Sequence, residues 1–100
     1  MPAPPPAHQP PLQTITEMIE RIPSLARRVE LKPFDAYAMD EWASGPVSPG
    51  ERMAASFILG VWDQHEPWKV GRFDIIEAFG RCDEKTRAVI SEWAADPFTL

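Results

Sequence analysis

The sequence has few residues that form disulfides or that bind metal ions through nitrogen or sulfur, because its 100 residues include a single cysteine, Cys82, and two histidines. A lone cysteine cannot close a disulfide within its own chain, and this usage is typical of a reducing compartment. The sequence also lacks a basic segment followed by an apolar one, the usual form of a secretory signal. We therefore expect a cytoplasmic protein.

Long apolar runs are missing as well. The longest, residues 53–62, is interrupted by Ser56 and Gly60. It has half of the roughly 20 residues that a membrane-spanning helix requires. We therefore expect no membrane partner.

Positive charge is scarce, with 10 Lys and Arg against 15 Asp and Glu and a net charge of −5. Nucleic-acid binding draws much of its free energy from counterions that basic residues release, so this balance argues against such a partner. An acidic surface instead favours another protein, and a basic one, as the partner.

Proline is the residue type in excess, and six of the twelve prolines lie within residues 2–11. Residues 1–11 contain no branched aliphatic side chain and no Phe, Tyr or Trp. Such a segment cannot bury enough apolar area to offset the entropy lost on ordering. We expect residues 1–11 to form a disordered arm and residues 12–100 to form a single helical domain.

From Leu12 onward, apolar residues recur at the spacing of a helix, and no stretch alternates for long enough to predict a strand. Thr14 and Glu17 have the spacing of a capping box at the first helix start. Pro23 should interrupt that helix, because it lacks an amide proton and clashes with the preceding turn. Asp35 is expected to cap the next helix.

The central helix has the clearest predicted start. Ser48 suits the N-cap, Pro49 suits the first helical position, and Glu51 completes a capping box. Residues 53–62 are apolar nearly all round, which is typical of a helix surrounded by other helices. Gly60 costs about 1 kcal/mol relative to Ala in a helix, so we expect a neighbouring backbone to pack closely there.

Two shorter helices should follow a loop of residues 63–71. The first is expected to end at Gly80, and Asp83 is expected to cap the second. The buried stripe of the second helix is predicted to consist of Thr86, Val89, Ile90 and Trp93. The sequence therefore predicts an all-α fold, a compact bundle of about five short helices around a central apolar helix.

Asp63, His65 and Glu66 place a histidine among carboxylates, which makes a small metal-dependent enzyme one alternative. The segment lacks the second histidine of the zinc-protease pattern, and Pro67 would break the helix that this pattern needs. Cys82 has no sign of the activating base that a nucleophilic thiol requires. We therefore predict no enzyme, no cofactor and no metal.

Residues 73–93 have the outline of a helix-turn-helix, so a DNA-binding regulator is a second alternative. The second helix would begin with Asp83 and Glu84, whose carboxylates would face phosphates unfavourably. An ordinary antiparallel pair of helices explains the same pattern.

Trp68 stands out among four tryptophans, because it lies in a proline-containing loop. Tryptophan is enriched at binding hot spots, so we predict that Glu66, Trp68 and Lys69 bind a partner. The alternative, that Trp68 folds back to cap the core, stays open. Our hypothesis is a small acidic, non-enzymatic protein that binds another protein. By analogy in size and charge, a phage-encoded inhibitor of a bacterial defence complex, as anti-CRISPR proteins are, belongs to this class. A homodimer is compatible with it.

Overall fold

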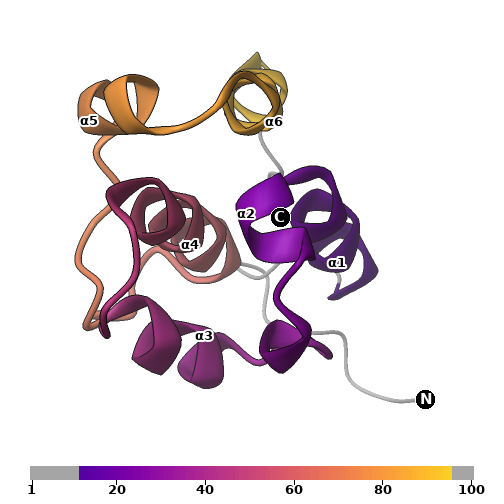
Figure 1. Cartoon of the computed structure of the whole chain (residues 1–100), viewed down its shortest axis with the longest axis vertical. Coiled ribbons are helices and arrows are strands. Elements are labelled where there is room, and N and C mark those ends of the chain that lie inside the picture. Colours follow the sequence, from indigo (N-terminus) through magenta and orange to yellow (C-terminus); the bar gives the residue numbers. More distant parts are fainter. Residues whose placement is uncertain (1–11, 96–100) are drawn as a thin grey trace.

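The computed structural model describes residues 12–95, which form helices joined by loops (Figure 1). No strand occurs within these residues, so the predicted all-α fold is confirmed. No helix in this part of the chain has the length and apolarity to cross a bilayer. The predicted arm of residues 1–11 lies outside the described residues. The helices are α1 (Leu12–Arg21), α2 (Pro23–Ala26), the 3-10 helix η1 (Val29–Leu31), α3 (Ala36–Ala43), α4 (Pro49–Trp62), α5 (Ile75–Arg81) and α6 (Glu84–Ala95).

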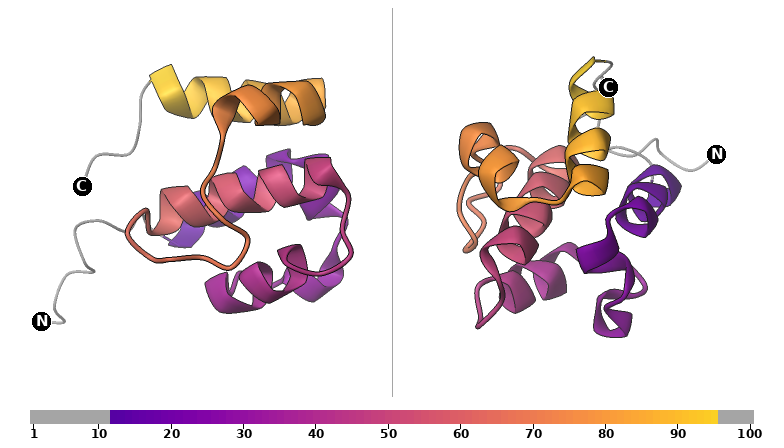
Figure 2. Two further views of the ribbon diagram at one scale, coloured as in Figure 1. Left: turned by 90° about the vertical axis from the view of Figure 1, so that its left-hand side faces the viewer. Right: turned by 45° about the horizontal axis from the view of Figure 1, so that its top comes forward.

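Helix α4 is the centre of the fold, as the sequence predicts. It contacts α1, α2, α3 and α5. Figure 2 (left) shows it running between α5 and α6 on one side and α3 on the other. Its fully or nearly fully covered residues are Glu51, Met53, Ala54, Ala55, Ser56, Phe57, Ile58 and Leu59.

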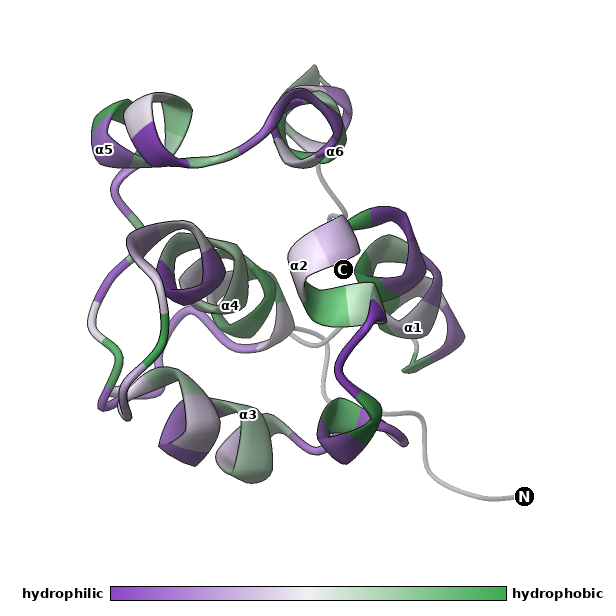
Figure 3. Ribbon diagram, in the orientation of Figure 1, coloured by the Kyte–Doolittle hydropathy of each residue, from purple (hydrophilic) through white to green (hydrophobic). Residues whose placement is uncertain are grey.

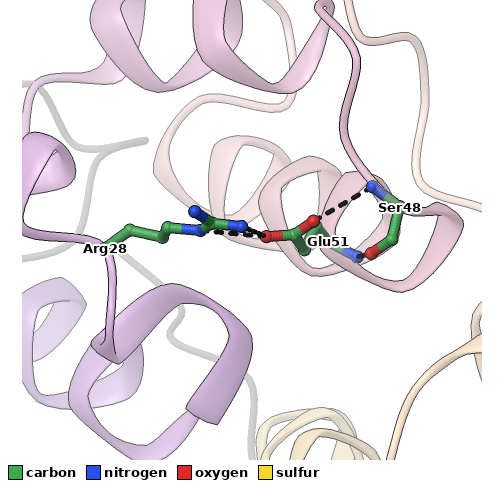
Figure 4. A network of polar contacts seen from close by, with 3 residues as sticks. All are labelled: Arg28, Ser48 and Glu51. Atoms are coloured by element: carbon green, nitrogen blue, oxygen red, sulfur yellow. Dashed lines mark hydrogen bonds and ion pairs between the residues drawn. The ribbon is translucent and has the colours of Figure 1, made fainter.

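The predicted capping box begins α4. The Ser48 hydroxyl accepts a hydrogen bond from the Glu51 amide at 3.1 Å, and Glu51 Oε1 accepts one from the Ser48 amide at 3.0 Å. Arg28 donates two more to Glu51 Oε2, at 3.0 and 2.6 Å (Figure 4). The hydrogen bond from the Ser48 amide lowers the pKa of Glu51, and the hydrogen bonds from Arg28 lower it further, whereas burial acts to raise it. The network therefore ties the chain after α2 to the start of α4 through a charged carboxylate.

This lowered pKa predicts that acid weakens the fold. A carboxylate with a lower pKa in the folded state stabilises fully above its unfolded-state pKa, and loses this effect as pH falls through the folded-state value. The free energy of unfolding should therefore decrease as the pH falls below about 5, near the unfolded-state pKa of a glutamate, as measured by urea denaturation. The pKa values of Asp83 and Glu92 are lowered as well, by the Thr86 side chain and by Arg21. Glu51→Gln should thus remove part of the pH dependence, and an unchanged slope would contradict this role.

Aspartate side chains cap the starts of α3, α5 and α6. Asp35 accepts hydrogen bonds from the Tyr37 and Ala38 amides, and Asp83 accepts one from the Thr86 amide at 2.8 Å, so both predicted caps are confirmed. Asp74, which sequence reasoning missed, caps α5.

The first helix differs from the prediction at its start. Helix α1 already includes Leu12, so Thr14 lies inside the helix and is not its cap. The predicted break at Pro23 is confirmed, because Ile22 is extended and Pro23 begins α2.

Two glycine predictions are wrong. A Cβ added at Gly60 would meet nothing within 4 Å, so no backbone packs against it. The close approach is at Gly50, where a Cβ would lie 2.9 Å from the carbonyl oxygen of Arg81. Gly80 lies inside α5, which continues to Arg81 before the chain turns extended at Cys82. Glycine thus allows the first turn of α4 to touch the end of α5.

Helix α6 covers the core on the side of α4 that is opposite to α3 (Figure 2, left). Its predicted stripe is confirmed, because Thr86, Val89 and Ile90 are buried and Trp93 packs against the core. The rings of Trp93 and Phe57 lie 5.7 Å apart in an edge-to-face arrangement. The helix also contacts α1, where Arg21 and Glu92 form an ion pair.

Candidate functional site

The segment between α4 and α5 is held in place by a buried carboxylate of α3. Asp40 accepts hydrogen bonds from the Lys69 amide at 3.0 Å and from the Val70 amide at 2.9 Å. The Lys69 ammonium also pairs with Glu41 at the surface. Figure 2 (left) shows this segment passing across α4 before it reaches α5. The middle of the segment is therefore fixed to α3 by hydrogen bonds from two of its main-chain amides to the Asp40 side chain.

Trp68 folds back onto the end of α4. Its indole N–H is shared between the carbonyl oxygens of Leu59 and Asp63, at 3.1 and 3.0 Å. The Leu59 carbonyl oxygen also accepts a hydrogen bond from the Asp63 amide at 2.9 Å, so the indole is a second donor at the end of the helix. The half-buried ring packs against the core, with the Tyr37 ring 5.5 Å away. The Trp68 side chain thus contacts the core and the end of α4, although the residue lies in the loop.

A cleft of about 490 Å³ opens between α4 and this segment. Gly60 leaves the α4 wall open, because it has no side chain and a Cβ there would meet no atom within 4 Å. Gly71 turns the opposite wall with a φ of 93°, a conformation that favours glycine. The lining residues are Ser56, Gly60, Gln64, His65, Glu66, Pro67, Trp68, Gly71 and Arg72.

The structure brings together two of the three predicted binding residues. Glu66 and Trp68 both line the cleft, whereas the exposed Lys69 side chain pairs with Glu41 outside the lining. Their role in binding stays a prediction. Amide, imidazole, carboxylate and guanidinium groups surround the cleft together with an indole, which suits recognition of a polar or aromatic group.

The residues of the metal-enzyme alternative do not form a ligand set. The His65 amide donates to the Asp63 carboxylate at 3.0 Å within the loop. Within residues 12–95, no group of three or more His, Cys, Asp and Glu side chains is arranged to hold a metal ion. Cys82 is buried, and its burial raises the pKa of the thiol. A raised pKa disfavours the thiolate, the reactive form of cysteine.

The helix-turn-helix alternative gains no support from the arrangement of α5 and α6. Helix α5 packs chiefly on α4, and α6 packs chiefly on α1. Figure 1 shows the two helices apart at the top of the molecule. The start of α6 carries Asp83 and Glu84, as the sequence indicates.

Sequence reasoning missed Asp40, although a signal was present. Ala36, Met39 and Ala43 share the buried face of α3, and Asp40 lies on the same face at helical spacing. A carboxylate on an apolar face requires hydrogen-bond donors, because burying it without partners is unfavourable. The donors, however, come from a loop that follows another helix.

Comparisons of the chain with protein-family models, with curated proteins and with solved structures gave no match. The function of this protein is therefore inferred from the geometry of the cleft and of the surface around it.

Proposed function

We propose that this protein acts by binding another protein, which inserts a side chain into the cleft between α4 and the segment of residues 63–72. The observation that carries the proposal is the cleft itself, kept open by Gly60. Interfaces draw most of their affinity from a few anchor side chains that fill pockets. A cleft of about 490 Å³ has room for an anchor of this kind.

The surroundings of the cleft resemble the anatomy of an interface. Trp68 lines it, and Tyr37 beside Trp68 is 64% exposed. The exposed Lys69 and Glu41 pair lies on the same side, where α3 holds the loop. Aromatic groups at the centre and charged groups at the rim are typical of protein contacts.

The anchoring of the loop also supports binding. Asp40 fixes the amides of Lys69 and Val70, and the Trp68 indole is hydrogen-bonded to α4. A surface that is ordered before binding loses less conformational entropy in the complex. These hydrogen bonds thus favour affinity because they order the loop before the partner binds.

The net charge of −5 favours a partner with a basic surface. Complementary charge accelerates association, and salt screens it. We expect the association rate to fall as the salt concentration rises.

Within this class, we propose an inhibitor of a bacterial defence complex, encoded by a phage and similar in action to anti-CRISPR proteins. Small size and acidic charge support this narrower proposal. Expression of the protein in a strain that restricts a phage should restore plaques, and unchanged restriction across such strains would contradict it.

Two substitutions of Gly60 test the binding proposal. Gly60→Gln should fill the cleft, whereas Gly60→Ala adds one methyl group to open space. Both replace glycine in a helix, so both should be at least as stable as the parent. Affinity capture from the native host, quantified by mass spectrometry, should recover the same protein with the parent and with Gly60→Ala.

The Gly60→Gln bait should lose that protein. Urea denaturation and circular dichroism of both variants provide the control for folding. Equal recovery by the two baits would show that the partner binds elsewhere or that no specific partner exists.

A further inference from the structure

Helix α5 exposes an unusual amount of apolar side chain. Ile76 is 84% exposed, Ile75 is 50% exposed and Phe79 is 41% exposed. Ala78 is the buried residue of this helix. Figure 3 shows the apolar positions of α5 in green, and Figure 1 shows the helix at the edge of the molecule. Neighbouring exposed apolar residues of this kind mark interaction surfaces.

The outward face of α5 has a defined shape. Residues in an α-helix are about 100° apart, so Ile76 and Gly80 lie opposite the buried Ala78. A Cβ added at Gly80 would meet nothing within 4 Å, so the position is open. The face therefore combines a protruding isoleucine with a depression one turn later.

The charges on α5 are arranged along one flank of this face. Glu77 and Arg81 are both exposed, and neither has an ion-pair partner among residues 12–95. Glu77 is closer to the start of the helix and Arg81 is at its end. The flank is thus acidic at one end and basic at the other.

We infer that α5 packs antiparallel against α5 of a second copy of this chain, in a dimer with twofold symmetry. A twofold axis between antiparallel helices brings the same flank of each helix together with its direction reversed. Glu77 then lies beside Arg81 of the partner subunit, and Ile76 lies over Gly80 of the partner subunit. A parallel twofold arrangement would instead place this flank beside the opposite flank of the other helix, which carries Ile75 and Phe79, so the charges would not meet.

The size of this contact sets the strength of the dimer. One seven-residue helix from each copy buries less than the roughly 800 Å² per partner of a standard stable interface. We expect a dissociation constant on the order of 0.1 mM, because the entropy lost on association offsets much of the apolar gain.

Sedimentation equilibrium of the full chain over a range from about 10 μM to about 1 mM tests the dimer. The parent should shift from monomer to dimer over this range, and Ile76→Asp should raise the dissociation constant at least tenfold. Val29→Asp is the matched control, because Val29 is 79% exposed on η1 and should leave the dimer unchanged. Circular dichroism should show that both variants remain helical.

A charge exchange tests the antiparallel geometry. Glu77→Arg and Arg81→Glu should each weaken the dimer, and the double variant should restore it to near the parent value. A monomer at about 1 mM, a dimer that Ile76→Asp leaves unchanged, or a double variant weaker than both single ones would overturn the inference.

The dimer is a proposal separate from partner binding at the cleft, and different variants test the two proposals. Gly60→Gln should block partner binding and keep the dimer, because Gly60 is on α4. Ile76→Asp should weaken the dimer and still recover the partner protein.

Discussion

Replacing Phe57 with Ala should lower the free energy of unfolding by about 3–5 kcal/mol. Phe57 is 2% exposed, and its ring lies 5.3 Å from the ring of Phe73 and 5.7 Å from that of Trp93. The side chain thus joins α4 to the segment before α5 and to α6. Small domains are stable by only about 5–15 kcal/mol, so this variant should be close to unfolding at room temperature.

Urea denaturation followed by helical circular dichroism measures this loss. Gly60→Ala is the control in the same helix, and it should raise the free energy of unfolding by roughly 0.5–1 kcal/mol, because a glycine costs stability inside a helix. If Phe57→Ala has the unfolding midpoint of the parent, α4 is not the centre of the core.

Trp68→Ala should lower the free energy of unfolding by about 2–3 kcal/mol, less than a fully buried tryptophan because the ring is half-buried. The substitution removes the ring from the core and leaves the Leu59 and Asp63 carbonyl groups without the indole donor. Trp68→Phe keeps most of the packing and loses the hydrogen bonds, so we expect a loss of about 1 kcal/mol.

Thermal and urea denaturation of the two variants separate packing from hydrogen bonding. A Trp68→Ala variant that unfolds like the parent would show that the ring contributes nothing to the core. Its affinity for a partner would then report on binding alone.

The parts of the fold that the sequence predicts correctly depend on neighbouring residues. Ser48 and Glu51 recognise each other within one turn, so their spacing alone indicates the start of α4. Asp35 and Asp83 cap helices for the same reason, and Pro23 interrupts α1 through its own ring. Local chemistry is sufficient at each of these positions.

The remaining features depend on contacts between distant segments. The position of Gly60 inside a helix indicates that it costs stability. It does not indicate whether another backbone or an open cleft lies next to the glycine. The close approach at Gly50 involves Arg81, and the donors to Asp40 come from a loop that follows α4. The sequence around Trp68 is likewise compatible with a partner contact and with a side chain that folds back onto the core. The structure shows that its indole donates to carbonyl groups at the end of α4.

The most direct test of partner binding at the cleft is calorimetric titration of the identified partner with Gly60→Ala and Gly60→Gln. Both variants keep the helix, and they differ in whether the cleft is filled. Blocking an anchor typically costs at least about 2 kcal/mol of binding, so the dissociation constant of Gly60→Gln should be at least roughly 30-fold higher. Equal dissociation constants would contradict the account.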